Sequence, residues 1–144
     1  MTSGPGEHGT SIGRRGAVGV VISEGRFLAI RRSENVVAPS ALCFPGGGIE
    51  AGETDEQAVV REFHEELGAA IVPVRCVWRS TTRWHVELAW WLGRLEVGAQ
   101  LAANPAEVAS IHWLTADEML ADVKLLASNR GFFWALAAGE ITLD

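Results

Sequence analysis

The sequence has few cysteines and no long apolar segment. Its two cysteines, Cys43 and Cys76, stand in apolar surroundings without a CxxC pair or a cluster of histidines. This pattern favours two reduced thiols in the core of a cytoplasmic protein over a disulfide or a zinc site. No window approaches the roughly 18 uninterrupted apolar residues of a membrane-spanning helix. Residues 1–14 also lack the apolar run of a secretory signal.

Positive charge is scarce as well. The chain has 12 Lys and Arg against 18 Asp and Glu, and its formal net charge is −6. This balance disfavours long nucleic acids as partners, because such binding requires many phosphates to be neutralised by Lys and Arg. It is compatible with a small phosphorylated substrate, since a bound metal ion supplies positive charge locally. We therefore expect a small phosphorylated ligand and neither a long nucleic acid nor a membrane as partner.

The length and composition fit one domain. Of the 144 residues, 48% are apolar and 21% charged, which suffices for a substantial core. Residues 1–14 are rich in Gly, Ser and Thr and lack apolar periodicity. We expect them to form a mobile tail, followed by a single domain over residues 15–144.

Strands and helices follow one another irregularly. The pattern predicts strands at 16–23, 26–31, 69–79, 84–97 and 110–114, and helices at 54–67, after Thr115 and at 124–138. Residues 45–48, Pro-Gly-Gly-Gly, are expected to break regular structure. Without regular βαβ alternation, the order favours an α+β or mixed-sheet sandwich over a doubly wound fold.

The helix predicted at 54–67 carries clear end signals. Thr54 and Gln57 have the spacing of a capping box, and Gly68 can take the left-handed conformation that ends a helix. Val60, Phe63 and Leu67 are expected to face the core.

Three acids lie close together on another face of this helix. Glu62, Glu65 and Glu66 occupy positions i, i+3 and i+4, within an arc of roughly 100°. Like charges at this spacing repel one another, and clustered carboxylate oxygens suit Mg²⁺ or Mn²⁺. Such a face is also common as plain solvated surface. The spacing alone leaves both readings open.

The glycine-rich segment before the helix adds a second signal. It lets the backbone approach a ligand closely and can direct N–H groups at phosphate oxygens, although a tight turn has the same composition. A Gly-Lys-Ser/Thr ending is missing, which excludes a P-loop.

From Gly47 onward the chain resembles the Nudix box, G-x5-E-x7-R-E-U-x-E-E-x-G-U, where U is aliphatic or bulky and apolar. Every fixed position is filled at the required interval. The residues are Gly47, Glu53, Arg61, Glu62, Phe63, Glu65, Glu66, Gly68 and Ala69. On these residues the chain is identified as a member of the Nudix (MutT-like) hydrolase family. The small Ala69 at the last U and Leu42, where many members have Trp, depart from the usual pattern.

The resemblance implies a fold and a cofactor. The fold is an α/β/α sandwich with a mixed β-sheet, in which the box forms a loop, a helix and a loop. The cofactor is Mg²⁺ or Mn²⁺, with Glu62, Glu65 and Glu66 as ligands. The backbone oxygen near Gly47 is a further expected ligand.

It also implies roles for charged residues around the metal. Arg61 is expected to pair with Glu53 and orient the site, which suits the specific geometry of Arg–carboxylate pairs. Glu107 is the candidate for an acid on a later loop, although a solvent-exposed loop acid is an equal alternative. The general base is expected to be Glu65 or Glu107.

The substrate is less well defined by the sequence. In the family that the chain resembles, some members carry a signature residue downstream of the box, a Pro in ADP-ribose enzymes and a Tyr in dinucleoside polyphosphate enzymes. This chain has no Tyr, and residues 79–87 contain no Pro, which weakens both assignments.

Trp84 is the candidate for stacking on a nucleobase. Arg31, Arg32 and Arg83 are candidate phosphate contacts, although exposed, solvated arginines are the default alternative. Most other aromatic residues of the 84–92 segment are expected in the core.

The predicted function is metal-dependent cleavage of a phosphoanhydride bond. The expected substrate is a nucleoside diphosphate derivative or a (deoxy)nucleoside triphosphate, and one product is a nucleoside monophosphate. A Nudix enzyme acting on a non-nucleotide diphosphate is one alternative, and a Nudix-like sensing or regulatory domain is another. Members of the family often form homodimers, so a homodimer is an expected assembly.

Overall fold

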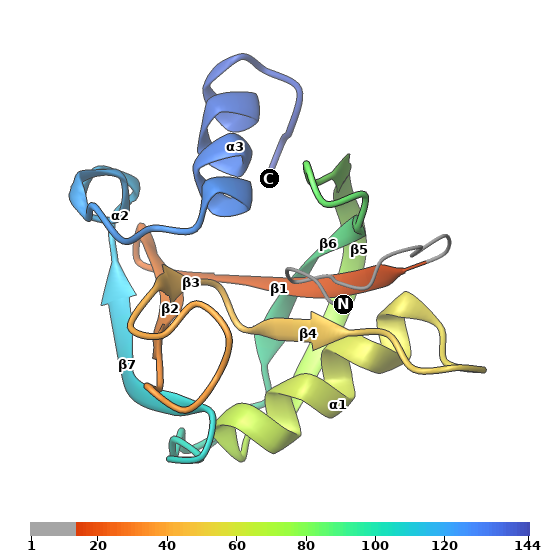
Figure 1. Ribbon diagram of the computed structural model, residues 1–144, viewed down its shortest axis with the longest axis vertical. Coiled ribbons are helices and arrows are strands. Elements are labelled where there is room, and N and C mark those ends of the chain that lie inside the picture. Colours follow the sequence, from red (N-terminus) through yellow and green to blue (C-terminus); the bar gives the residue numbers. More distant parts are fainter. Residues whose placement is uncertain (1–13) are drawn as a thin grey trace.

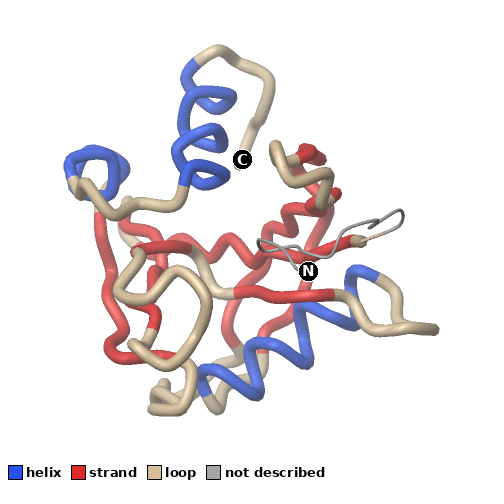
Figure 2. The backbone as a smooth tube through the Cα atoms, in the orientation of Figure 1, coloured by secondary structure: helices blue, strands red, loops and turns tan. Residues whose placement is uncertain are grey.

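The computed structural model describes residues 14–144 (Figures 1 and 2). The tail expected at residues 1–14 therefore lies, apart from Arg14, outside the described residues. The strands are β1 (Arg15–Ser23), β2 (Arg26–Arg32), β3 (Leu42–Cys43), β4 (Gly46–Gly48), β5 (Ile71–Thr81), β6 (Glu87–Leu95) and β7 (Val108–Leu114). The helices are α1 (Asp55–Leu67), α2 (Ala116–Ala121) and α3 (Ala127–Ala137).

The strands form one mixed sheet with β1 at its centre. The main path runs β3-β2-β1-β6-β5, with β4 also paired to β1 and β7 paired to β2. β1 is antiparallel to β2 and β4 and parallel to β6. The expected α+β fold with a mixed sheet is confirmed, and α1 and α3 lie on opposite sides of β1 (Figure 1).

Alternation along β1 divides the core between these two sides. Val18 and Val20 belong to the core on the α3 side, whereas Ala17 and Val21 pack on the α1 side. Successive residues of a strand point to opposite faces, so a continuous apolar run serves both sides. The near-absence of polar residues in β1 follows from this double burial.

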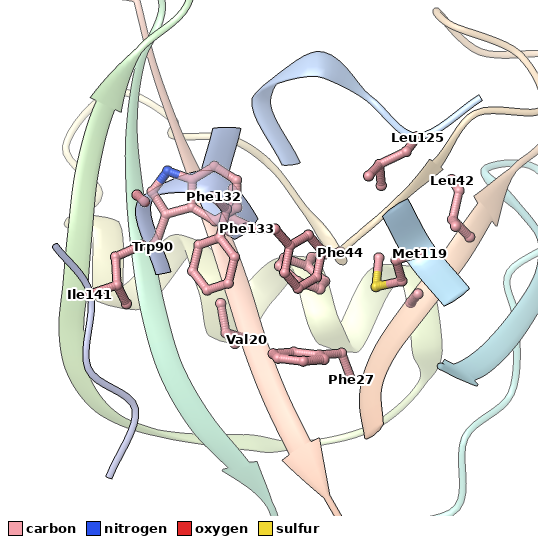
Figure 3. Close-up of a cluster of buried hydrophobic side chains, with 13 residues drawn as sticks. Val20, Phe27, Leu42, Phe44, Trp90, Met119, Leu125, Phe132, Phe133 and Ile141 are labelled. Atoms are coloured by element: carbon pink, nitrogen blue, oxygen red, sulfur yellow. The ribbon is translucent and has the colours of Figure 1, made fainter. Parts of the chain in front are cut away.

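The core beneath α3 is rich in aromatic rings (Figure 3). Phe132 stacks on Trp90 with ring centroids 5.1 Å apart, and it meets Phe44 edge-on at 5.3 Å. Such offset and edge-to-face pairs add to the energy of area burial. Because Phe44 directly precedes Pro45 and β4, this packing fixes the start of the glycine-rich segment.

Helix α1 begins and ends as expected, but it is rotated relative to the prediction. Thr54 and Gln57 form both hydrogen bonds of a capping box, and Gly68 caps the helix in the left-handed conformation. The expectation that Val60 faces the core was wrong, since its exposed fraction is 39% while Val59 is fully buried. The inner face of α1 instead carries two acids. It is formed by Ala58, Val59, Glu62, Phe63, Glu66 and Leu67.

The expectation that residues 45–48 lack regular structure was also wrong. Gly46–Gly48 forms β4 and pairs antiparallel with Gly16–Val18 of β1. A ladder uses backbone groups only, so glycines can form it where chains approach closely. A Cβ at Gly46 would overlap the Ala17 carbonyl oxygen. The glycine pattern thus reflects a close strand contact as well as a turn.

Two predicted elements begin later than expected. Residues 84–86 lie outside β6, because Thr82 N–H donates to Val86 O and closes a turn there. Residues 124–126 do not join α3 but bond to Leu42, through Lys124 O and Leu126 N–H. In both places, hydrogen bonds that cannot be read from the local sequence pattern hold the backbone outside the predicted strand or helix.

The two cysteines do not pair with each other. Cys43 and Cys76 are both free thiols; Cys43 is buried and Cys76 is half-buried. Among residues 14–144, no helix combines the length and the apolar character needed to cross a membrane.

Candidate active site

Three carboxylates from two separate segments meet beside the glycine-rich strand. Glu62 and Glu66 project from successive turns of α1, and Glu107 comes from the turn before β7. One oxygen from each lies within 4.8 Å of the others. The structure therefore joins Glu107, expected only from a loose pattern, to two of the three helix acids.

Burial makes this cluster electrostatically unusual. The exposed fractions are 8% for Glu62 and 4% for Glu66. Burial raises the pKa of Glu66 to about 8, the charge of Glu62 adds to the rise, and the Gly46 N–H, 3.1 Å from Oε1, opposes it. Burial also raises the pKa of Glu62, although a hydrogen bond from Arg61 opposes the effect. Charged carboxylates that lie this close together and away from water need a nearby cation to compensate their negative charge.

Arg61 connects the acids to the glycine-rich strand. Its Nε donates to Glu53 Oε2 at 2.7 Å and its Nη2 to Glu53 Oε1 at 3.0 Å, a two-pronged pair. Nη1 donates to Glu62 at 3.0 Å, and Nη2 also reaches Gly48 O at 2.8 Å. The Arg61 guanidinium holds the pKa of Glu53 down at about 2. Arg61 thus keeps helix, loop and strand in one geometry.

Glu65 stands apart from the buried cluster. Its side chain is 44% exposed, and its Oε1 accepts a hydrogen bond from Arg61 Nη1 at 3.2 Å. It does not belong to the group of Glu62, Glu66 and Glu107, whose oxygens lie within 4.8 Å of one another. The helix therefore presents two acids inward and one at the solvent boundary.

Gly47 lies directly against the acids. A Cβ at this position would come within 2.5 Å of the Glu62 carboxylate carbon and of Oε2. Only glycine leaves room here, so the backbone of β4 reaches the cluster itself. This close approach is compatible with the expected role of a Gly47 backbone oxygen as a ligand.

An open cleft of about 980 Å³ adjoins the cluster, and Gly47 and Gly48 form part of its lining. Its volume lies near the upper end of small-molecule sites, about 300–1,000 Å³. Apolar side chains and hydroxyl groups both line it. Within the described part of the chain, the charged side chains that line it are Arg14, Arg15, Arg32 and Arg83. In a protein of net charge −6, this cleft is therefore locally positive and suits an anionic ligand.

Trp84 and Arg31, both expected to contact substrate, differ in their positions. Trp84 lines the cleft, is 44% exposed, and lies under the guanidinium of Arg83 at 4.7 Å. Arg31 instead donates to Asp122, with Nη2 2.7 Å from Oδ2, and is not brought to the cleft lining. The neighbouring Arg32 lines the cleft and its charge lowers the pKa of Glu66.

Sequence reasoning missed Trp78 and Asn104 as parts of this region, whereas Arg32 and Arg83, which the sequence offers as possible phosphate contacts, both line the cleft. Trp78 lines the cleft from β5. Asn104 precedes Pro105, a pair that favours a turn and was the one available signal.

Comparison with known proteins gives a consistent family assignment. Residues 13–135 match the family described as NUDIX domain. A MutT-like protein of Streptomyces ambofaciens is 36% identical over 104 residues, which cover 70% of this chain and 63% of that protein. This chain thus spans less than two thirds of that relative. An 8-oxo-dGTP diphosphatase of Escherichia coli is 36% identical over 110 residues, covering 71% and 84%.

Solved structures share the fold. A MutT protein from Methanosarcina mazei superposes with a TM-score of 0.74 at 24% identity, covering 87% of this chain and 93% of that one. A MutT NUDIX hydrolase from Burkholderia pseudomallei gives 0.67 at 24% identity, covering 90% and 98%. At these identities the likeness supports the architecture.

Proposed function

The chain belongs to the NUDIX family of hydrolases, and we propose that it is a metal-dependent enzyme that cleaves a phosphoanhydride bond of a nucleotide. The proposed substrate is a nucleoside diphosphate derivative or a (deoxy)nucleoside triphosphate, and a nucleoside monophosphate is released. Relatives named 8-oxo-dGTP diphosphatase and ADP-ribose pyrophosphatase support the choice of nucleotides. The observation that carries the proposal is the Glu62–Glu66–Glu107 cluster, with Glu62 and Glu66 buried, next to Gly47 in the lining of a positive cleft.

The residues fit a divalent cation. Three carboxylate oxygens lie within 4.8 Å of one another, and Arg61 donates to only one of these three side chains, Glu62. Hard oxygen donors without thiolates or imidazoles suit Mg²⁺ or Mn²⁺. We assign Glu62, Glu66 and Glu107 as ligands, with the Gly47 backbone beside Glu62 as the source of a further oxygen and Glu65 at the solvent boundary. When bound, the ion supplies charge neutralisation for the departing phosphate and lowers the pKa of water.

Glu65 is our choice for the general base. Its carboxylate is half-exposed and only one of its oxygens accepts from Arg61. The other oxygen can accept a proton from water and pass it to solvent. Glu107 lies inside the cluster, where a ligand role suits it better. Arg61, through Glu53 and Gly48 O, holds the loop in place for both groups.

The cleft accounts for substrate binding. Trp84 offers an exposed ring for a nucleobase, as such rings do in other nucleotide sites. Arg32 lines the cleft, and its charge lowers the pKa of Glu66, so it is suited to bind a phosphate oxygen. Arg31 is less suited to this role because its guanidinium pairs with Asp122.

A nucleotide panel tests the proposal. Release of nucleoside monophosphate, with phosphate or pyrophosphate, is measured in Mg²⁺, in Mn²⁺ and with chelator. Turnover of at least one nucleotide that stops with chelator supports the proposal. Saturable nucleotide binding without turnover points to a sensing domain instead, and turnover confined to non-nucleotide diphosphates points to the other alternative.

A further inference from the structure

The third carboxylate of the cluster belongs to a short turn and not to a helix or strand. Glu107 lies in this turn, directly before β7 and far along the chain from α1. We infer that Asn104 is a positioning residue that holds Glu107 in the cluster, an inference that rests on the proposed function.

Asn104 binds the end of the helix that carries the other two acids. Its backbone N–H donates to Glu66 O at 2.9 Å, and its side-chain Nδ2 donates to Glu65 O at 3.2 Å. These carbonyls lie in the last turn of α1, where helical partners are missing and outside donors are needed. Both bonds therefore tie the turn to the segment that presents Glu62 and Glu66.

The same residue also shapes the turn itself. Its Oδ1 accepts from Ala106 N–H at 3.1 Å, which is the bond of an Asx turn. Its backbone oxygen accepts from Glu107 N–H at 2.9 Å and from Val108 N–H at 2.8 Å. One end of Asn104 thus holds the helix, while the other end sets the direction in which Glu107 leaves the turn.

Ser33 holds the turn from the opposite side. Its N–H donates to Glu107 O at 3.0 Å and its Oγ to Ala106 O at 3.1 Å, and its exposed fraction is 5%. Ser33 directly follows β2, so it fixes the turn relative to the sheet. Among residues 14–144, Asn104 is the residue of this turn whose side chain bonds α1, through Nδ2 to Glu65 O, so its loss should free the turn from the helix.

Metal binding in the absence of substrate tests this role. Mn²⁺ affinity is measured by electron paramagnetic resonance for the wild type, Asn104→Ala, Asn104→Ser and Glu107→Gln. We expect about a tenfold weaker affinity for Asn104→Ala, within the range seen when groups that orient metal ligands are removed. Asn104→Ser can still accept from Ala106 N–H but cannot reach Glu65 O, so it should lie between the alanine variant and the wild type.

A double variant shows whether Asn104 acts through Glu107. If it does, Asn104→Ala should weaken Mn²⁺ binding little or not at all in a Glu107→Gln background. Asn35→Ala, at an exposed asparagine in the 33–41 loop, is the matched control and should bind Mn²⁺ like the wild type. Thermal unfolding verifies that each variant is folded. If Asn104→Ala does not fold, Asn104→Ser takes its place in the comparison.

The outcomes separate this inference from the proposed function. Wild-type Mn²⁺ affinity in a folded Asn104→Ala or Asn104→Ser protein overturns the inference, as does an equal loss with and without Glu107. A wild type that hydrolyses no nucleotide but shows the expected Mn²⁺ series overturns the function and supports the inference. A wild type that binds no Mn²⁺ overturns both.

Discussion

Arg61 holds Glu53 with two hydrogen bonds, Nε to Oε2 at 2.7 Å and Nη2 to Oε1 at 3.0 Å. This pair joins the middle of α1 to the loop that precedes it. The same guanidinium reaches Glu62 and the Gly48 carbonyl. The acids and the glycine-rich strand therefore depend on one side chain for their relative positions.

The pairing predicts a specific response to acid. The pKa of Glu53 falls from its ordinary 4.5 to about 2 in the folded protein, chiefly through the hydrogen bonds from Arg61. A lowered folded pKa gives stability that is present above pH 4.5 and lost as the pH falls toward 2. Glu53→Gln should therefore lose less stability than the wild type over this range, as measured by thermal unfolding. Glu56→Gln, at an exposed acid in the first turn of α1, is the control. An unchanged acid profile in Glu53→Gln would contradict the pairing.

The contribution of Glu66 to stability should depend on pH in the opposite direction. Burial raises its folded pKa from 4.5 to about 8, so its contribution is fully present below pH 4.5 and disappears as the pH rises through 8. The metal-free wild type should lose thermal stability between pH 5 and pH 9, and Glu66→Gln, which stays neutral, should lose less. Mg²⁺ at pH 8 should raise the melting temperature of the wild type and hardly change that of the variant. Equal dependence of the melting temperature on pH in both proteins would contradict a raised pKa at Glu66.

The contact between Gly47 and Glu62 predicts a position that tolerates no side chain. In Gly47→Ala the new Cβ would come within 2.5 Å of the Glu62 carboxylate, and such overpacking costs about 1–3 kcal/mol. We expect weaker Mn²⁺ binding and lower turnover. In Gly48→Ala the Cβ meets no atom of residues 14–144 within 4 Å, so this variant should lose much less Mn²⁺ affinity and turnover. Similar losses in the two variants would mean that the close approach is not what matters.

The cleft predicts separate effects for two exposed tryptophans. Trp84 lines the cleft, whereas Trp134 on α3 is 64% exposed and lies outside the cleft lining. Stacking of a base on an aromatic ring contributes about 1–3 kcal/mol, so Trp84→Ala should raise KM about tenfold with little change in kcat. Trp134→Ala should leave both constants near wild type. Steady-state kinetics on the nucleotide that is turned over decides the matter, and an unchanged KM in Trp84→Ala would exclude base stacking there.

The sequence predicted what depends on local chemistry. The cap residues Thr54 and Gly68 set both ends of α1, because their bonds are made within a few residues along the chain. The identities of the box residues likewise led to the family and the fold. These features need no knowledge of distant segments.

Features that depend on packing between distant segments were missed. The side of α1 that faces the sheet decides that Glu62 and Glu66 are buried while Glu65 and Val60 are not. A small error in helix rotation is enough to exchange these positions. The strand formed by Gly46–Gly48 exists because β1 lies beside it. Likewise, Arg31 pairs with Asp122, far along the chain, whereas Arg32 lines the cleft. Such relationships arise only when the elements meet.

The proposed mechanism is tested most directly by the rate of Mg²⁺-dependent release of nucleoside monophosphate by the wild type and by Glu65→Gln. We expect the variant to fold, to bind Mn²⁺ nearly as tightly as the wild type, and to lose about 10²–10⁴-fold in kcat, as is usual when a general base is removed. Glu107→Gln should differ by losing Mn²⁺ affinity, because its carboxylate belongs to the buried cluster. Full turnover by Glu65→Gln, or turnover by the wild type that persists with excess chelator, would contradict the proposed mechanism.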